Sequence, residues 1–419
     1  MMASSFPNDY DNDKHTPEDI LTTCQRGDNV TLCRFLSGHH LGTIDVNANY
    51  EGRTLLNEAV MMGHVEIVKE LLRHGANAQK KDSMSQFPLL LAAMAGHREI
   101  AEVLLVQGGV SVNQQNSLGL SALHFAAARG DCPLATKLLM RGAAVDSCGL
   151  ARQTPLAAAA SRGETEMCLF LLANGANINF RKHGHATPLF GAVEGGFVGT
   201  AKQLIQAGAN VSITTTSGDT PLIVACRGPP RGRGQMAVVD LLLERRCDVN
   251  AGAGRAASPL HEASAAGNVD VVRLLLARHA NVHATNSAGL TPLHSACALG
   301  EVAVARLLCE AGADCHASSE RGNPMTMLLA RTPPDNMGST ARVVAELESA
   351  CRRRAAWQRR RAWCLFLVGS RLLSGKREGE GGDNEGEREE DDATLDGIKV
   401  AVLSVLQNTM LCRLVASYI

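Results

Sequence analysis

The chain has 419 residues and a formal net charge of −1, which conceals basic and acidic segments that nearly cancel. Aromatic residues make up only 3% of the chain, which argues against a core of large rings and favours short helices packed through small side chains. Thirteen cysteines are scattered without a C-x-x-C pair, so we expect reduced thiols in a cytoplasmic or nuclear protein and not a disulfide framework.

The N-terminal segment, residues 1–15, is polar and acidic, and we expect it to be disordered. It contains no apolar stretch, so we predict no signal peptide. No apolar run in the chain reaches the roughly 18 residues of a membrane-spanning helix, so we expect no membrane span.

From residue 54 onward, a short block recurs about every 33 residues. Its clearest copies begin with Thr-Pro-Leu at residues 154, 187 and 220, and with Ser-Pro-Leu-His or Thr-Pro-Leu-His at residues 258 and 291. Weaker copies begin at residues 54, 87, 121 and 323. A fixed period of this length indicates a stacked array, in which each unit buries its apolar face against its neighbours. Such arrays usually bind other macromolecules along a long surface.

The stretch from Asn286 to Asp314 illustrates how one period forms one structural unit. Thr291 can cap a helix that begins with Pro292, a position where the missing N–H of proline costs nothing. A second helix is expected over residues 301–310, and Gly312 supplies its left-handed cap. Both helices are too short to be stable alone in water, so we expect them to depend on stacking.

The pattern Thr-Pro-Leu-His-x-Ala, Gly-x-x-x-Val-Val-x-x-Leu-Leu and Gly-Ala-Asn resembles the ankyrin repeat over residues 16–351. The resemblance implies an all-α solenoid of about ten stacked helix-turn-helix units with short hairpin-like turns. It also implies an N-terminal cap over residues 16–48 and a C-terminal cap over residues 323–351. His124, His261 and His294 share one slot of the block, and the resemblance implies that this slot hydrogen-bonds to adjacent backbone.

One junction of the array departs from the pattern. The spacing between residues 220 and 258 is 38, which places five extra residues around Gly228–Gly232, between the two helices of that unit. Arg246 and His279 stand where other units have the glycine of the second-helix cap. A side chain in a left-handed cap costs roughly 1–2 kcal/mol, so we expect this junction to be the least stable part of the stack.

Two constellations suggest chemistry but do not meet its requirements. Cys309, Cys315 and His316 match no standard zinc spacing. Gly369–Lys376 has five residues between its glycines and Arg377 after its lysine, whereas a phosphate loop needs four residues and then Ser or Thr. We therefore expect no catalytic, metal or cofactor site, no small-molecule substrate and no enzymatic activity.

Two charged segments follow the array. Residues 352–375 carry two arginine triplets, and this basic extension fits a solvated helix, a nuclear-import signal or an amphipathic helix for a calmodulin-type partner or a membrane surface. Residues 376–392 are rich in Gly and Glu, and we expect them to form a disordered linker that screens the arginines. For that reason we expect no nucleic-acid partner.

The last segment, residues 393–419, is apolar and periodic, which predicts a C-terminal amphipathic helix. Its Leu411–Leu414 stretch resembles the suppressor-of-cytokine-signalling box of ubiquitin-ligase adaptors. However, Asn408 and Ala416 stand where that box has aliphatic residues. A substrate adaptor that recruits a ligase through this helix is therefore the alternative to a plain interaction scaffold. Docking of the helix on the chain itself or on an unknown partner is a third possibility.

In ankyrin-like proteins, partners usually contact the turn tips and the exposed end of the first helix of each unit. These slots predict a partner-binding set of Tyr50, Arg53, Met84, Gln86, Arg129, Leu150, Gln153, Arg162, His183, Glu194, Arg227, Arg231 and Arg233. The five arginines from Arg129 to Arg233 could form a broken basic row that binds a protein partner with an acidic patch, or could be ordinary solubilising charge. We expect the chain to be a monomer.

Overall fold

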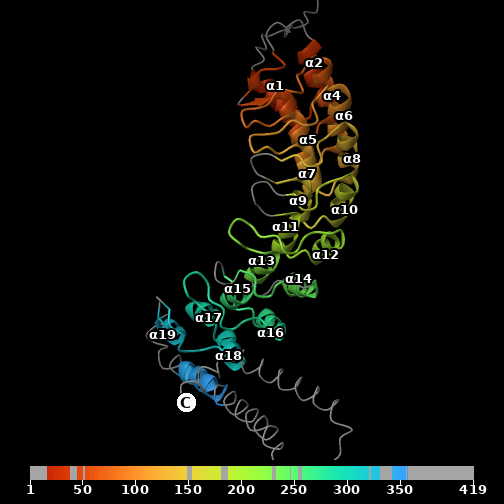
Figure 1. Ribbon diagram of the computed structural model, residues 1–419. Helices are drawn as coiled ribbons and strands as arrows, with labels where there is room; N and C mark the ends of the chain where they lie inside the picture. Colours follow the sequence, from red (N-terminus) through yellow and green to blue (C-terminus); the bar gives the residue numbers. More distant parts are fainter. Residues whose placement is uncertain are drawn as a thin grey trace, which may run out of the picture. The chain divides into compact units, whose positions relative to one another are not determined.

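Paired short helices make up most of the structure, which is a computed structural model of the chain (Figure 1). It describes residues 17–37, 45–50, 52–148, 153–180, 187–228, 233–245, 247–252, 257–319, 322–330, 342–354 and 356. The chain divides into two compact units, Met1–Pro292 and Leu293–Ile419, and each is described by itself. None of the helices in the described part is long and apolar enough to cross a membrane.

In the first compact unit the helices come in pairs along the chain. The pairs are α1 (Pro17–Arg26) and α2 (Asn29–Ser37), α3 (Leu55–Met62) and α4 (Val65–Arg73), α5 (Pro88–Ala95) and α6 (Arg98–Gln107), α7 (Ala122–Ala128) and α8 (Cys132–Met140), α9 (Pro155–Ala160) and α10 (Thr165–Ala173), α11 (Pro188–Glu194) and α12 (Val198–Gln206), α13 (Pro221–Arg227) and α14 (Arg233–Glu244), and α15 (Pro259–Ala265) and α16 (Val269–Ala277). The first helices of successive pairs contact one another in one layer, and the second helices in another (Figure 1).

The second compact unit continues the same pattern. It contains nearly all of α17 (Pro292–Leu299), followed by α18 (Val302–Ala311), α19 (Pro324–Ala330) and a helix over residues 342–354. We expected the helix now labelled α18 to span residues 301–310, and it begins and ends one residue later. The helix over residues 342–354 runs through Arg352–Arg354, so the first arginine triplet of the basic extension is helical.

The first helices begin where the repeated block predicts. The Oγ1 atoms of Thr54, Thr154 and Thr220 accept hydrogen bonds from the backbone N–H three residues later, at 3.1, 3.2 and 3.3 Å. Proline occupies the first turn of most of these helices. The capping residue and the proline therefore determine where the helix begins, and the side chain of the leucine that follows is buried.

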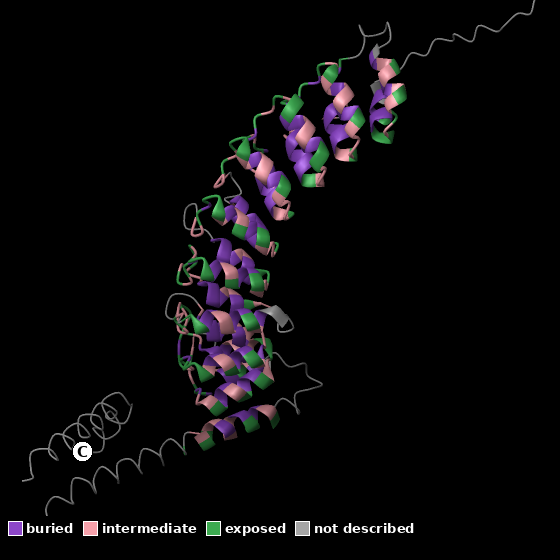
Figure 2. Cartoon of the chain, turned by 90° about the vertical axis from the view of Figure 1, so that its right-hand side faces the viewer, coloured by how far each residue is buried: buried purple, intermediate pink, exposed green. Residues whose placement is uncertain are grey.

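In each repeat, the core lies between the first and the second helix (Figure 2). Its repeated element is the leucine of the block, which is at most 1% exposed in seven successive copies: Leu56, Leu89, Leu123, Leu156, Leu189, Leu222 and Leu260. The only sheet among the described residues is a hairpin in which β1 (Asn49–Tyr50) pairs antiparallel with β2 (Arg53–Thr54). The prediction of an all-α solenoid of helix-turn-helix units is confirmed.

The second helices end at a residue with a left-handed backbone conformation. Gly312, which was predicted to have this role, ends α18 with a φ of 105°. His279 holds the same place after α16 with φ 64°, so a side chain does occupy a left-handed cap at this junction. Arg246, at the equivalent place after α14, lies outside the described residues, as do residues 1–16 and 357–419. The predictions for the acidic linker, the ligase-adaptor box and the phosphate-loop near-miss therefore fall outside the described part of the chain.

Candidate partner-binding surface

The histidine slot of the block has a structural role, as the resemblance implied. Nε2 of His124 lies 2.8 Å from the Gln153 carbonyl oxygen, Nε2 of His261 lies 2.8 Å from that of Leu290, and Nε2 of His294 lies 3.3 Å from that of Gly322. In His124 the other ring nitrogen, Nδ1, accepts from the backbone N–H of Ser121 at 3.1 Å, so Nε2 carries the proton and donates. Burial lowers the pKa of His124 and of His294.

Asn57 occupies this same slot in the unit of α3 and α4, which the sequence reasoning did not single out. Its Nδ2 donates to the Gln86 carbonyl oxygen at 3.2 Å, so a carboxamide makes the inter-repeat bond that imidazole makes elsewhere. The side chain of Asn57 is 0% exposed. Its position three residues after Thr54 is the signal that could have identified it.

Four members of the predicted partner-binding set are exposed at or just after the ends of successive first helices. Arg129 directly follows α7, Arg162 lies two residues after the end of α9, Glu194 ends α11 and Arg227 ends α13. We call these four residues the first-helix row. The half-buried Gln153 supplies the carbonyl that His124 binds. Leu150, His183 and Arg231 lie outside the described residues, and of Arg233 only the backbone, at the start of α14, is described.

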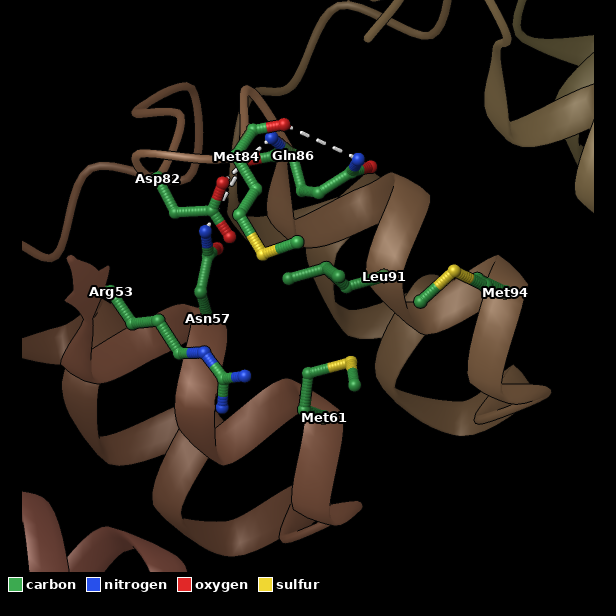
Figure 3. Close-up of a pocket in the computed structure, with 8 residues that line it drawn as sticks. All are labelled: Arg53, Asn57, Met61, Asp82, Met84, Gln86, Leu91 and Met94. Carbon is green, nitrogen blue, oxygen red and sulfur yellow. Dashed lines mark hydrogen bonds between the residues drawn. The ribbon is translucent and has the colours of Figure 1, made fainter. Parts of the chain in front are cut away.

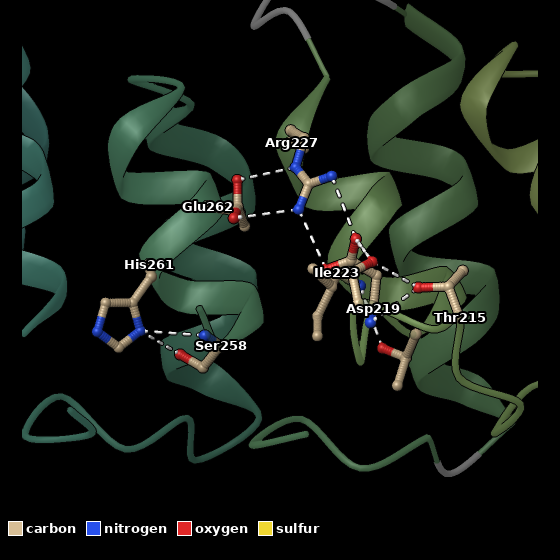
Figure 4. Close-up of polar contacts among 9 residues, drawn as sticks. Thr215, Asp219, Ile223, Arg227, Ser258, His261 and Glu262 are labelled. Carbon is tan, nitrogen blue, oxygen red and sulfur yellow. Dashed lines mark hydrogen bonds and ion pairs between the residues drawn. The ribbon is translucent and has the colours of Figure 1, made fainter. Parts of the chain in front are cut away.

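The arginines of the first-helix row are not equally free to meet a partner. Arg227 lies between two carboxylates: its Nη2 is 3.2 Å from Oδ1 of Asp219, and its Nε is 3.2 Å from Oε2 of Glu262 (Figure 4). The hydrogen bond to Glu262 raises the pKa of Arg227. Because two negative charges flank one positive charge, the potential at this point of the row is not basic. Arg129 donates through Nη1 to the Met94 carbonyl oxygen at 3.3 Å, and no carboxylate of the described residues forms an ion pair with it.

Three further members of the predicted set are brought together at the other end of the first compact unit. Arg53, Met84 and Gln86 line a pocket of about 220 Å³ whose other walls are Asn57, Met61, Asp82, Leu91 and Met94 (Figure 3). Tyr50 belongs to the same hairpin as Arg53, and its hydroxyl donates to the Asp45 carbonyl at 2.9 Å. The pocket is therefore built by β2, α3, α5 and the turn formed by residues 82–86.

The cysteine side chains are the thiols that could act as nucleophiles or metal ligands. All eleven cysteines that the structure describes are free. Burial raises the pKa of Cys24 and of Cys168 to about 12, which keeps both as neutral thiols. Among the described residues, no three His, Cys, Asp or Glu side chains group as a metal site.

Comparison with known proteins identifies the repeat. A family model described as ankyrin repeats (3 copies) matches residues 4–82, 89–182, 156–253 and 232–319. The B-cell lymphoma 3 protein homolog of Mus musculus is 32% identical over 123 residues, which cover 29% of this chain and 28% of that protein. The B-cell lymphoma 3 protein of Homo sapiens is 39% identical over 123 residues, which cover 29% of this chain and 27% of that protein. The matched stretch thus spans less than a third of either relative.

Among solved structures, the ankyrin repeat domain of Bcl-3, described as a unique member of the IkappaB protein family, aligns with a TM-score of 0.46 and 25% sequence identity. The alignment covers 56% of this chain and 100% of that domain. The family model, in contrast, extends over well more than half of the residues and follows the same repeated block that builds the paired helices. The chain therefore belongs to the ankyrin-repeat family, whose repeats mediate protein–protein interaction.

Proposed function

We propose that the chain is a non-catalytic scaffold that binds a protein partner along the turn tips and first-helix ends of the first compact unit. The observation that carries the proposal is the first-helix row itself, in which four successive units expose a charged side chain at or beside the same slot. Neighbouring packed helices are about 8–10 Å apart. A partner that contacts several such slots at once gains affinity from a surface that each unit alone is too small to provide.

The partner patch that faces Arg129 and Arg162 is acidic in this proposal. Both side chains are exposed, and neither forms an ion pair with a carboxylate of the described residues, whereas Arg227 is already neutralised by Asp219 and Glu262. We therefore assign the electrostatic part of recognition to Arg129 and Arg162, and give Arg227 a structural role between α13 and α15. A protein partner is proposed, with no small-molecule substrate and no nucleic acid.

The structural use of the polar slot supports the non-catalytic reading. A general base must be able to reach a substrate proton, but the Nε2 atoms of His124, His261 and His294 are occupied by backbone carbonyls. Because free cysteines are typical of a reducing compartment, we propose that the scaffold acts in the cytoplasm or nucleus. We also propose that it acts as a monomer.

The experiment that tests the scaffold is affinity capture with the full-length chain, followed by association kinetics with the captured partner. Arg129→Glu combined with Arg162→Glu should slow association, and the slope of its rate against salt should fall, because rim charges act mainly on the encounter. Lys202→Glu, an exposed charge reversal on the second-helix layer, is the matched control. Unchanged association rates in the double variant would reject the proposal of an acidic partner patch. Failure to capture any partner would reject the scaffold function.

The ligase-adaptor alternative is tested in the same capture. It depends on residues 393–419, which lie outside the described part of the chain. Cullin or elongin partners that are captured by the full-length chain and lost by a chain ending at Ser374 would favour the adaptor. Their absence from both samples would reject it.

A further inference from the structure

The pocket of Figure 3 has an apolar wall made of methionines from separate segments. Met61 and Met94 occupy the same place near the ends of α3 and α5, and Met84 reaches over from the turn of residues 82–86. Met84 is 64% exposed and Met94 is 38% exposed. Exposed methionines gathered around one hollow form an apolar surface that can adapt to its ligand, because the side chain is unbranched and polarizable.

Two hydrogen-bond acceptors of the pocket have no partner. Asn57 Oδ1 and Gln86 Oε1 are both buried and accept no hydrogen bond within the described residues. The orientation of the Asn57 carboxamide is set by its Nδ2, which donates to the Gln86 carbonyl, so turning the amide over would place two oxygens together. A buried acceptor without a donor is unfavourable, and such groups in native proteins call for an explanation.

The pocket also contains a donor. One nitrogen of Arg53, Nη1, is held 2.8 Å from Oε2 of the buried Glu58, while the side chain as a whole remains 44% exposed. A guanidinium has five N–H donors, so others are left for a ligand carbonyl. Asp82 is occupied differently, because its Oδ1 accepts from the backbone N–H of Gln86 at 2.8 Å.

We propose that this pocket, which we call the methionine pocket, binds an extended peptide segment of the partner protein through one apolar side chain. The side chain packs against Met61, Leu91 and Met94. A neighbouring main-chain carbonyl accepts from Arg53, and a main-chain N–H donates to Asn57 Oδ1 or Gln86 Oε1. The inference rests on the proposed scaffold function and names its occupant: apolar wall, donor and acceptors side by side match the groups of a peptide, whereas a purely ionic ligand would leave the methionines unused.

The size and cover of the pocket agree with this occupant. Its volume of about 220 Å³ is many times the ~10–15 Å³ that one water needs, so the pocket has room for an apolar side chain. Both orphan acceptors are buried, and the Met84 side chain lies between the Asn57 carboxamide and Leu91 (Figure 3). Binding to Asn57 Oδ1 therefore includes a rotation of Met84, which its exposure allows.

The test begins with linear peptides displayed on phage and selected on the immobilised full-length chain. The expected peptides share one large apolar residue, and a synthetic representative should shift the methyl signals of Met61, Met84 and Met94 in a chain with methyl-labelled methionine. N-methylation of the peptide bonds beside the apolar residue, which removes their donors, should weaken binding by about tenfold or more.

Variants of the chain separate the pocket from its surroundings. Met61→Ser with Met94→Ser removes apolar wall, and Gln86→Met removes one orphan acceptor while keeping the length of the side chain. Asn57→His removes the other acceptor and keeps the inter-repeat bond in the form seen at His124. The wall variant should weaken peptide binding by about tenfold or more, and so should whichever of Gln86→Met and Asn57→His removes the acceptor that the peptide uses. Met62→Ser is the control, because Met62 is 46% exposed beside Met61 but does not line the pocket. Circular dichroism confirms that each variant is folded.

Several outcomes would overturn the methionine pocket. Peptides without an apolar anchor, no enriched peptide, or equal affinity for the pocket variants and Met62→Ser would each do so. Methyl shifts that depend on protein concentration without peptide would assign the pocket to a second copy of this chain and also reject the proposal. If the affinity-captured partner still binds while the pocket variants have no effect, the scaffold function stands and the pocket alone falls; if no partner is captured, the scaffold function itself fails.

Discussion

His124 and Gln153, 29 residues apart, are joined by a hydrogen bond of 2.8 Å between Nε2 and the carbonyl oxygen. Asn57 and Gln86, also 29 residues apart, are joined by the same bond through Nδ2 at 3.2 Å. The slot therefore accepts either an imidazole or a carboxamide as the inter-repeat donor. Only the imidazole titrates near neutral pH, so the choice of residue decides whether the junction is sensitive to pH.

His124→Asn should reduce the pH dependence of stability. Burial lowers the pKa of His124 below its ordinary value of 6.5, so the unfolded chain binds the proton first as the pH falls. The contribution of neutral His124 is thus fully present above about pH 6.5 and is lost progressively below it, with a slope of at most about 1.4 kcal/mol per pH unit. The variant should lose that slope while keeping the bond to Gln153.

The measurement is urea unfolding of both proteins at pH 7.5 and at mildly acidic pH. His283→Asn, a substitution at an exposed histidine, controls for the loss of one histidine from the chain. At pH 7.5 the free energy of unfolding of the His124→Asn variant should be lower by about 1–3 kcal/mol, because the buried Ser121 N–H loses its acceptor. A pH slope as steep as that of the wild type would show that His124 is not the titrating group.

His279→Gly should stabilise the chain. His279 holds a left-handed φ of 64° at the end of α16, where Gly175 and Gly208 stand in earlier units with φ of 87° and 97°. Glycine adopts this conformation without steric conflict, and the expected gain is up to about 1 kcal/mol after its larger unfolded-state entropy is counted. Thermal unfolding measures the change. His279→Ala keeps a Cβ and should give no gain, so equal stabilisation by alanine would refute the explanation by backbone conformation.

Arg53→Met should destabilise the first compact unit through Glu58. The Glu58 carboxylate is 1% exposed and is held by Arg53 Nη1 at 2.8 Å and by Gln25 Nε2 at 3.1 Å. Removing the arginine leaves a buried charge with a single neutral donor, which costs about 1–3 kcal/mol. Glu58→Gln in the same chain removes the charge and should recover part of the loss. A double-mutant cycle measured by urea unfolding would show no coupling if the two side chains act independently.

The fold was predictable because local residues determine the structure of each repeat. In α9, for example, Thr154 caps the helix, Pro155 is its first residue and Leu156 is buried in the core. The properties of the surface were harder to predict from the sequence, because they depend on contacts between repeats. Arg227 forms one ion pair within its own repeat, with Asp219, but its second partner, Glu262, lies 35 residues away. The methionine pocket likewise combines side chains of two repeats, and three of its residues, Arg53, Met84 and Gln86, belong to the partner-binding set that the sequence predicts.

Cys351 should be the most reactive of the described thiols. It lies on the helix over residues 342–354, with its Sγ 3.4 Å from the Ala313 carbonyl oxygen. Hydrogen bonds from the Cys309 and Cys315 thiols lower the pKa of Cys351, with further help from the Cys315 backbone N–H. Burial and the negative charge of Asp314 raise this pKa, and the Ala313 carbonyl favours the thiol form because it accepts from it, but the three donors outweigh these effects.

A lowered pKa means that Cys351 is already thiolate below the roughly 8.5 of a free cysteine. Its alkylation by iodoacetamide should therefore level off at lower pH than that of an unstructured thiol, whereas Cys297, whose burial raises its pKa to about 12, should react slowly throughout. Peptide mass spectrometry follows each cysteine separately, including Cys364 and Cys412. Cys309→Ala removes one donor and should slow the alkylation of Cys351 at acidic pH. Cys33→Ala, a substitution far from Cys351 in the sequence, should leave that rate unchanged. A Cys351 profile centred near 8.5 in the wild type would rule out stabilisation of the thiolate by its neighbours.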